Sequence, residues 1–170
     1  LRCCVSENNH FYTRVLGTSD LKLVPQMEKI ELRCHKNAWN AQSLRECFDS
    51  SYIVIGLFCD EKLIGFSVIY NTRFTTDLLT IGVDPEYQGM GLGTQLLDAT
   101  LKKADELDAV ECYLEVRVSN QIAINLYEKF GFAKVGVRKN YYNAVGSVPA
   151  EDAYTMHRYS PNVRREELRR

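Results

Sequence analysis

Apolar and polar positions follow two different periods along the chain. Helical spacing of apolar side chains occurs over residues 20–33 and 41–49, after residue 93, and after an N-cap at Ser119 or Asn120. Runs typical of strands occupy residues 52–58, 63–70, 78–83, 110–117, 133–139 and 152–159. This order predicts one mixed α/β domain, and Asp20 is the predicted N-cap of its first helix.

The predicted elements leave short segments at both ends of the chain. Residues 1–17 are expected to form an N-terminal extension or a first strand, residues 18–159 the domain, and residues 160–170 a charged tail. A length of 170 residues suits a single domain, because domains commonly contain about 100–200 residues.

Composition and charge argue against a nucleic-acid-binding protein, a membrane-spanning protein and a metalloprotein. Lys and Arg number 21 and Asp and Glu number 22, so the net charge of −1 offers no strong cationic field for a nucleic-acid backbone. No apolar run approaches the roughly 20 residues of a membrane-spanning helix. The six cysteines form no C-x-x-C pair and no zinc-ligand spacing with the three histidines, which predicts reduced thiols and no metal site. We therefore expect a cytoplasmic protein without nucleic-acid or membrane partners.

The segment after residues 78–83 carries the most specific local pattern. Pro85 prevents the strand from continuing, and Gly89, Gly91 and Gly93 precede a strong helical stripe. A helix start has unpaired N–H groups and a partial positive charge, so a diphosphate can bind there if no side chain blocks it. The Gly-Lys-Ser/Thr ending of a Walker loop is absent, and Thr94 replaces the third glycine of G-x-G-x-x-G. A tight strand-to-helix turn is the alternative explanation.

The strand over residues 110–117 is expected to present charged side chains on one face. Alternation places Cys112 and Leu114 on an apolar face and Glu111 and Glu115 on the opposite face. A strand inside a sheet rarely carries such a row unless that face borders a cleft, so Glu115 is a candidate general base. On spacing alone, an ordinary solvated glutamate is equally consistent. Cys112 lies opposite Glu115, which argues against a covalent thiol intermediate.

Several motifs follow one another in order over residues 18–159. They are Gln88-x-x-Gly91-x-Gly93, LEVRVSN over 114–120, AINLYEKFGF over 123–132, RKNYY over 138–142 and EDA over 151–153. Together they resemble the motifs of the GCN5-related N-acetyltransferase (GNAT) superfamily. The combination is most similar to the RimI-type ribosomal-protein alanine N-acetyltransferases. This resemblance implies a single-domain GNAT fold with a mixed central sheet flanked by helices. It also implies acetyl-CoA-dependent acetylation of the N-terminal alanine of a small-subunit ribosomal protein.

The resemblance also assigns an acetyl-CoA site. The backbone of Ile81, Gly82 and Val83 is expected to pair with the pantetheine arm, and Asn120 is expected to reach the cofactor from the next helix. The diphosphate is expected to lie against Gln88, Gly89, Met90, Gly91, Leu92, Gly93 and Thr94. RimI-type sequences usually carry basic residues just after the glutamine and after the last glycine, where this chain has Gly89, Met90 and Thr94. We therefore expect backbone N–H groups to meet most of the phosphate charge.

For the reaction, the resemblance implies direct transfer with Glu115 as base and Tyr127 as the acid that protonates the departing thiolate. Without the resemblance, Tyr127 is a core tyrosine with its hydroxyl at the edge. A tyrosine with a pKa near 10 keeps its proton at neutral pH, which suits that role.

The resemblance places the peptide N-terminus between two walls. One wall follows Trp39, and the other contains Arg138, Tyr141 and Tyr142. Surface aromatic residues of a hairpin are the alternative explanation for the second wall. Because neighbouring strand residues point to opposite faces, Tyr141 and Tyr142 are expected to point apart.

Two other functions remain open. The first is acetylation of a lysine side chain, a polyamine or another small amine, which a comparison of N-terminally blocked and free peptides would distinguish. The second is a non-catalytic CoA-binding module, which would bind the cofactor without turnover.

Overall fold

The computed structural model of the chain describes residues 8–162. Its helices are η1 (Thr18–Leu23), α1 (Val24–Cys34), α2 (Ala41–Glu46), η2 (Pro85–Tyr87), α3 (Leu92–Glu106) and α4 (Gln121–Lys129), of which η1 and η2 are 3₁₀ helices. Its strands are β1 (Phe11–Leu16), β2 (Tyr52–Cys59), β3 (Lys62–Asn71), β4 (Thr75–Val83), β5 (Glu111–Arg117), β6 (Ala133–Tyr142) and β7 (Glu151–Tyr159). Cys3, Cys4 and most of the predicted charged tail lie outside the described residues.

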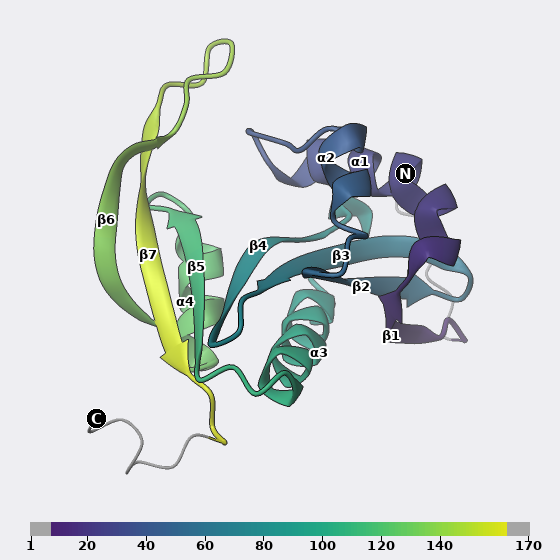
Figure 1. Cartoon of the computed structure of the whole chain (residues 1–170). Coiled ribbons are helices and arrows are strands. Elements are labelled where there is room, and N and C mark those ends of the chain that lie inside the picture. Colours follow the sequence, from purple (N-terminus) through teal and green to yellow (C-terminus); the bar gives the residue numbers. More distant parts are fainter. Residues whose placement is uncertain (1–7, 163–170) are drawn as a thin grey trace. The chain divides into compact units, whose positions relative to one another are not determined.

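The strands of the described chain form one mixed sheet in the order β1-β2-β3-β4-β5-β7-β6 (Figure 1). β1 pairs antiparallel with β2, and β7 pairs antiparallel with both β5 and β6. β4 pairs parallel with β5, from Thr75 opposite Glu111 to Leu78 opposite Leu114. A parallel pair needs a long crossover connection, and α3 lies in the connection between β4 and β5. The predicted α/β class with a mixed sheet is therefore confirmed.

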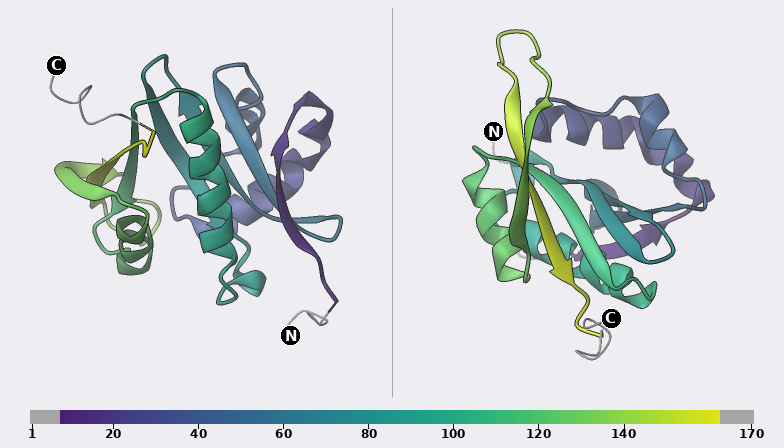
Figure 2. Two further views of the ribbon diagram at one scale, coloured as in Figure 1. Left: turned by 90° about the horizontal axis from the view of Figure 1, so that it is seen from below. Right: turned by 60° about the vertical axis from the view of Figure 1, so that its left-hand side comes forward.

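The described chain divides into two compact units. The N-terminal unit runs to Ile69 and resumes over Thr80–Thr100. In it, α1 and α2 cover one face of β2 and β3, and the first turns of α3 lie on the other face (Figures 1 and 2). Between α1, α2 and the strands lies a core of buried side chains that includes Met27, Ile30, Leu44, Val54 and Phe66. On the α3 side, the hydroxyls of Ser67 and Thr100 are 2.7 Å apart and hydrogen-bonded.

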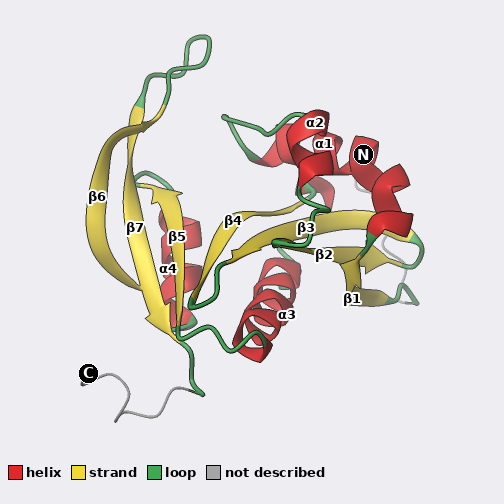
Figure 3. Cartoon of the chain, viewed as in Figure 1, coloured by secondary structure: helices red, strands yellow, loops and turns green. Residues whose placement is uncertain are grey.

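The C-terminal unit comprises Tyr70–Leu79 and the chain from Leu101 onward. In this unit α4 lies along one face of β5 and β7, and its Ile124 and Tyr127 side chains are buried (Figures 1 and 2). β6 and β7 form a long hairpin, and the loop over residues 143–150 extends beyond the paired strands (Figure 3). The side chains of β5 that the sequence predicted to be polar are half-buried and alternate with buried ones.

The first part of the chain differs from the sequence prediction. The first α-helix begins at Val24, and Asp20 lies within η1 instead of capping that helix. The Asp20 carboxylate accepts the N–H of Gly17 at 2.9 Å and forms an ion pair with Arg14 at 2.8 Å. The prediction was wrong because this carboxylate pairs with Arg14 of β1 and closes the first turn of η1, contacts that the residue type of Asp20 does not reveal. β1 occupies part of residues 1–17, for which an extension or a strand was expected.

Candidate active site

The N-terminal unit passes from β4 to α3 through an exposed glycine segment. Gly89 and Gly91 have φ angles of 80° and 76°, in the left-handed region that other residues rarely adopt. The N–H of Gln95 bonds to the carbonyl of Gly91, so the N–H groups at the start of α3 have no partner within the helix. These first residues are Leu92, Gly93 and Thr94. A Cβ on any of the three glycines would meet no atom within 4 Å, so the segment has room for a diphosphate.

Not every side chain of this segment faces a ligand. The Leu92 side chain is buried and can offer only its backbone, whereas Met90 is exposed. The side-chain amide of Gln88 donates to the carbonyl of Val83 at 2.9 Å. Gln88 thus fixes the end of β4, a contact that the sequence did not predict.

Side-chain donors from α1 also reach the end of β4. The thiol of Cys34 donates to the Val83 carbonyl at 3.2 Å, and His35 Nε2 lies 3.1 Å from the Ile81 carbonyl. The approach is close, since a Cβ on Gly82 would lie 3.0 Å from the Cys34 sulfur. The strand expected to bind the pantetheine arm is thus held in place by α1.

Burial alternates along β5 in the C-terminal unit as the sequence predicted. The buried side chains are those of Cys112, Leu114 and Val116, and the half-buried ones are those of Glu111, Tyr113, Glu115 and Arg117. The Glu115 side chain is 27% exposed, and its carboxylate accepts a hydrogen bond from Arg138 at 3.2 Å. Burial, together with the charge of Glu115, raises the pKa of Asp77 on β4. A half-buried carboxylate on this face has the exposure that proton transfer to and from a substrate requires.

Tyr141 and Tyr142 do not point apart, so that expectation was wrong. Their rings meet edge to face with centroids 5.1 Å apart. Asn140 has a φ of 48°, and the β6–β7 register shifts between Arg138 and Tyr142, which breaks the alternation of the strand. The guanidinium of Arg138 lies 4.4 Å from the Tyr141 ring centroid, and that of Arg117 lies 4.2 Å from the Tyr142 ring centroid. The two tyrosines and two arginines thus form stacked cation–π pairs.

Tyr127 and Asn120 belong to α4. Tyr127 is 8% exposed and packs edge to face against Phe132, with ring centroids 5.9 Å apart. Burial raises the pKa of Tyr127, and nearby Tyr142 raises it further, so the hydroxyl keeps its proton at neutral pH. Asn120 is the N-cap, and its side-chain oxygen accepts the N–H of Ala123 at 3.2 Å. The side-chain oxygen of Asn120 thus caps α4.

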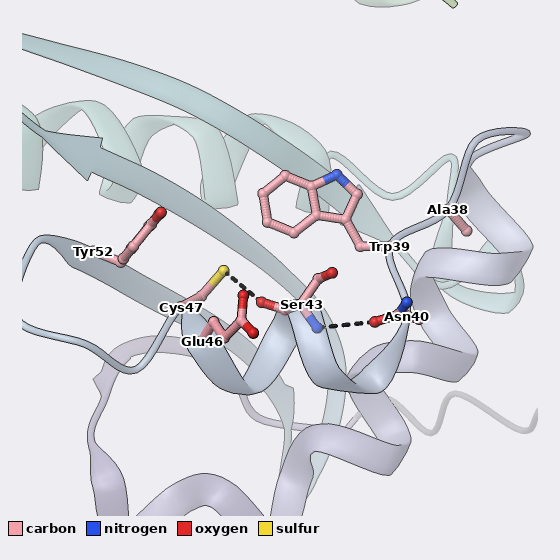
Figure 4. Close-up of a pocket in the computed structure, with 7 residues that line it drawn as sticks. All are labelled: Ala38, Trp39, Asn40, Ser43, Glu46, Cys47 and Tyr52. Carbon is pink, nitrogen blue, oxygen red and sulfur yellow. Dashed lines mark hydrogen bonds between the residues drawn. The ribbon is translucent and has the colours of Figure 1, made fainter. Parts of the chain in front are cut away.

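A pocket of about 380 Å³ opens beside α2 in the N-terminal unit (Figure 4). It is lined by Ala38, Trp39, Asn40, Ser43, Glu46, Cys47 and Tyr52, of which only Glu46 carries a formal charge. The indole of Trp39 and the ring of Tyr52 supply aromatic surface to it (Figure 4). The pocket is the size of a small ligand site and gives the predicted Trp39 wall a concave surface.

Glu31 on α1, which the sequence did not single out, is only 2% exposed. Its carboxylate accepts the hydroxyl of Thr80 at 3.1 Å and the backbone N–H of Trp39 at 3.5 Å. A signal was available, since Glu31 follows Met27 by four residues and Val24 by seven on the buried stripe of the helix. A carboxylate on such a stripe needs partners, because an unpaired buried charge is costly.

Residues 8–162 contain no group of three or more His, Cys, Asp or Glu side chains that could hold a metal ion. In that part of the chain, no helix is both long and apolar enough to cross a membrane. The cytoplasmic location and the absence of nucleic-acid partners stay predictions.

Comparisons with known proteins agree with this architecture. The sequence model of the acetyltransferase (GNAT) family matches residues 24–132. The ribosomal protein bS18 alanine N-acetyltransferase of Salmonella typhimurium is 34% identical over 128 residues, which cover 75% of this chain and 84% of that protein. The crystal structure of the ribosomal-protein-S18-alanine N-acetyltransferase from Escherichia coli has a TM-score of 0.81 and 29% identity, and the match covers 92% of this chain and 97% of the other. For Ard1 from Thermoplasma volcanium the TM-score is 0.75 at 25% identity, with 88% and 97% covered.

The family and fold expected from the motifs are therefore confirmed. The family match covers more than half of the chain, and it includes β4, the glycine segment, β5 and α4. GNAT acetyltransferases use acetyl-CoA as acetyl donor, and the bare start of α3 fits its diphosphate. On this evidence the chain is an acyltransferase that belongs to the GNAT family.

Proposed function

We propose that the chain is an N-α-acetyltransferase that transfers acetyl from acetyl-CoA to the N-terminal alanine of a small-subunit ribosomal protein. The observation that carries the proposal is the 34% identity, over 75% of this chain, to a protein named ribosomal protein bS18 alanine N-acetyltransferase. The TM-score of 0.81 to an Escherichia coli protein of the same activity supports it.

In this proposal Glu115 is the general base. A peptide α-amine has a pKa of about 7.7–8.0, against about 10.4 for a lysine side chain, so only a modest base is needed. Glu115 accepts the proton of the ammonium directly or through a water molecule. The hydrogen bond from Arg138, 3.2 Å long, orients the carboxylate for this step.

Tyr127 is the general acid. As the neutral amine attacks the thioester carbonyl carbon, a C–N bond forms and the C–S bond breaks. Tyr127 gives its proton to the departing sulfur, and the attacking nitrogen loses its second proton to water as the amide forms. Glu115 then releases its proton to solvent, and water reprotonates Tyr127. The raised pKa of Tyr127 keeps it protonated before that step. The N–H of Val83 is assigned to the charge that develops on the carbonyl oxygen.

Acetyl-CoA is assigned mainly to the glycine segment before α3 and to the end of β4. The N–H groups at the start of α3 hold the diphosphate, and the backbone of Ile81, Gly82 and Val83 holds the pantetheine arm. Gln88 acts on the cofactor through the Val83 carbonyl that it binds at 2.9 Å. The amide nitrogen of Asn120 is assigned to the cofactor as well.

The substrate assignments use residues of both predicted walls. Trp39 and its pocket receive a side chain of the peptide, and Arg138, Tyr141 and Tyr142 contact the peptide near its N-terminus. Stacked rings and guanidinium groups present flat, partly apolar surfaces with N–H donors, which suit a peptide backbone.

The deciding experiment uses two peptides of one sequence that begins with Ala and contains a lysine. One peptide has a free N-terminus and the other is blocked, and mass spectrometry locates the acetyl group after incubation with acetyl-CoA. We expect acetyl on the α-amine of the free peptide and none on the blocked one. Modification of the lysine in both peptides would assign the enzyme to side-chain amines. Binding of acetyl-CoA without acetylation of any amine would identify the chain as a non-catalytic CoA-binding module.

A further inference from the structure

Glu31 is a buried carboxylate for which the proposed reaction has no use. It lies on α1, is 2% exposed, and accepts hydrogen bonds from the Thr80 hydroxyl at 3.1 and 3.3 Å. It also accepts the backbone N–H of Trp39 at 3.5 Å. Burial raises its pKa. The Glu31 carboxylate thus links β4, which is assigned to the pantetheine arm, to the Trp39 segment, which is assigned to the peptide.

His35, the C-cap of α1, is the next residue in this network. Its Nε2 lies 3.1 Å from the carbonyl oxygen of Ile81 and 3.9 Å from a carboxylate oxygen of Glu31. Both neighbours are acceptors, so Nε2 carries a proton whether the imidazole is neutral or charged. His35 therefore donates a hydrogen bond to the backbone of β4.

The hydrogen bond from His35 lies on the edge of β4 that is assigned to the acetyl donor. In a strand, the N–H and C=O groups of one residue point to the same edge, and those of the residue two positions away point there too. The carbonyls of Ile81 and Val83 thus share an edge, and both already accept a side-chain donor from α1, Cys34 in the case of Val83. The N–H groups of Ile81 and Val83 lie along the same edge. A thioester or amide carbonyl of the acetyl donor is the kind of group that they would bind.

We propose that His35 is a positioning residue for acetyl-CoA: its Nε2–H holds the Ile81 carbonyl and so fixes the β4 edge that binds the pantetheine arm. Glu31 supports this contact and ties the Trp39 backbone to the same strand. The inference rests on the proposed function only in its assignment of Ile81 and Val83 to acetyl-CoA. It concerns cofactor binding and requires no particular amine substrate.

The test compares His35→Phe, which keeps a ring but loses the donor, with His35→Gln, whose amide N–H can replace Nε2–H. Titration calorimetry gives the Kd for acetyl-CoA without peptide, and steady-state kinetics separates KM from kcat. Lys36→Ala, an exposed neighbour on the same loop, is the matched control. We expect His35→Phe to raise Kd and KM for acetyl-CoA about five- to tenfold, because a single net hydrogen bond is lost, while kcat changes less than about twofold. His35→Gln should recover most of the loss.

Several results would overturn the inference. One is wild-type affinity in His35→Phe, and another is equal loss in the Phe and Gln variants, which would mean a purely structural role. Melting temperatures of all variants show whether a loss of affinity merely follows a loss of folding. If the wild-type chain binds no acetyl-CoA, the proposed function fails together with the inference. If wild type binds and acetylates but His35→Phe is unaffected, only the inference fails.

Discussion

The guanidinium of Arg138 on β6 lies 3.2 Å from the carboxylate of Glu115 on β5. The two strands are not neighbours in the sheet, since β7 lies between them. The Arg138 side chain is 56% exposed, and exposed ion pairs contribute only about 0–1 kcal/mol to stability. The contact therefore matters for the orientation of the carboxylate more than for the free energy of folding.

Glu115→Gln should lower kcat about 10²- to 10⁴-fold, because the amide cannot accept the amine proton. The side chain keeps its size and can still accept the Arg138 hydrogen bond, so the melting temperature should stay close to that of wild type. Glu111→Gln, on the same face of β5, is the control and should retain near wild-type turnover. A wild-type rate in Glu115→Gln would remove Glu115 as the base.

Tyr127→Phe should also lower kcat about 10²- to 10⁴-fold, since it removes the proton given to the thiolate. Burial raises the pKa of Tyr127 above its ordinary value of 10, so the acid form persists through alkaline pH. The wild-type pH–kcat profile should therefore show no fall from tyrosine ionisation below about pH 10. A descending limb near pH 8 that disappears in Tyr127→Phe would contradict the raised pKa, and a wild-type rate in Tyr127→Phe would remove Tyr127 as the acid. Tyr113→Phe serves as the control for loss of a tyrosine hydroxyl.

The β5 strand shows what a local pattern can predict. Its buried face consists of Cys112, Leu114 and Val116, and a one-residue shift would bury charges, so alternation alone placed Glu115 correctly on the polar face. The glycine segment was similarly informative, because the left-handed φ angles of Gly89 and Gly91 favour glycine. Both features depend on residues close together in the sequence.

The features that the sequence did not predict depend on distant residues. The buried carboxylate of Glu31 accepts a hydrogen bond from Thr80, which is 49 residues away. The alternation of Tyr141 and Tyr142 fails because Asn140 adopts a positive φ, which asparagine tolerates but does not require. Asp20 was assigned as an N-cap from its residue type, whereas Arg14 of β1 engages its carboxylate. In each case a tertiary contact or a backbone irregularity overrode the local preference.

Gly91→Ala and Gly93→Ala should have opposite effects on stability. Alanine at Gly91, where φ is 76°, should cost about 1–2 kcal/mol of the free energy of unfolding. Alanine at Gly93, inside α3 and without a positive φ, should raise it by about 0.5–1 kcal/mol. Both methyl groups should weaken acetyl-CoA binding if the diphosphate lies on this backbone. Urea unfolding and calorimetry measure the two quantities, and wild-type affinity in the more stable Gly93→Ala would place the diphosphate elsewhere.

Thr94→Arg should strengthen acetyl-CoA binding at a small cost in stability. Thr94 is exposed in the first turn of α3, where this chain lacks the basic residue usual in the RimI-type sequences that it resembles. A guanidinium there can pair with a phosphate, and we expect the Kd for acetyl-CoA to fall about three- to tenfold at low salt. The gain should shrink at high ionic strength, because salt screens exposed charges, whereas the neutral control Thr94→Gln should show neither effect.

A positive charge at a helix N-terminus opposes the helix dipole, so the free energy of unfolding of Thr94→Arg without ligand should fall by about 0.3–1 kcal/mol. Unchanged affinity at low salt in a folded Thr94→Arg protein would mean that the phosphates do not lie at the start of α3.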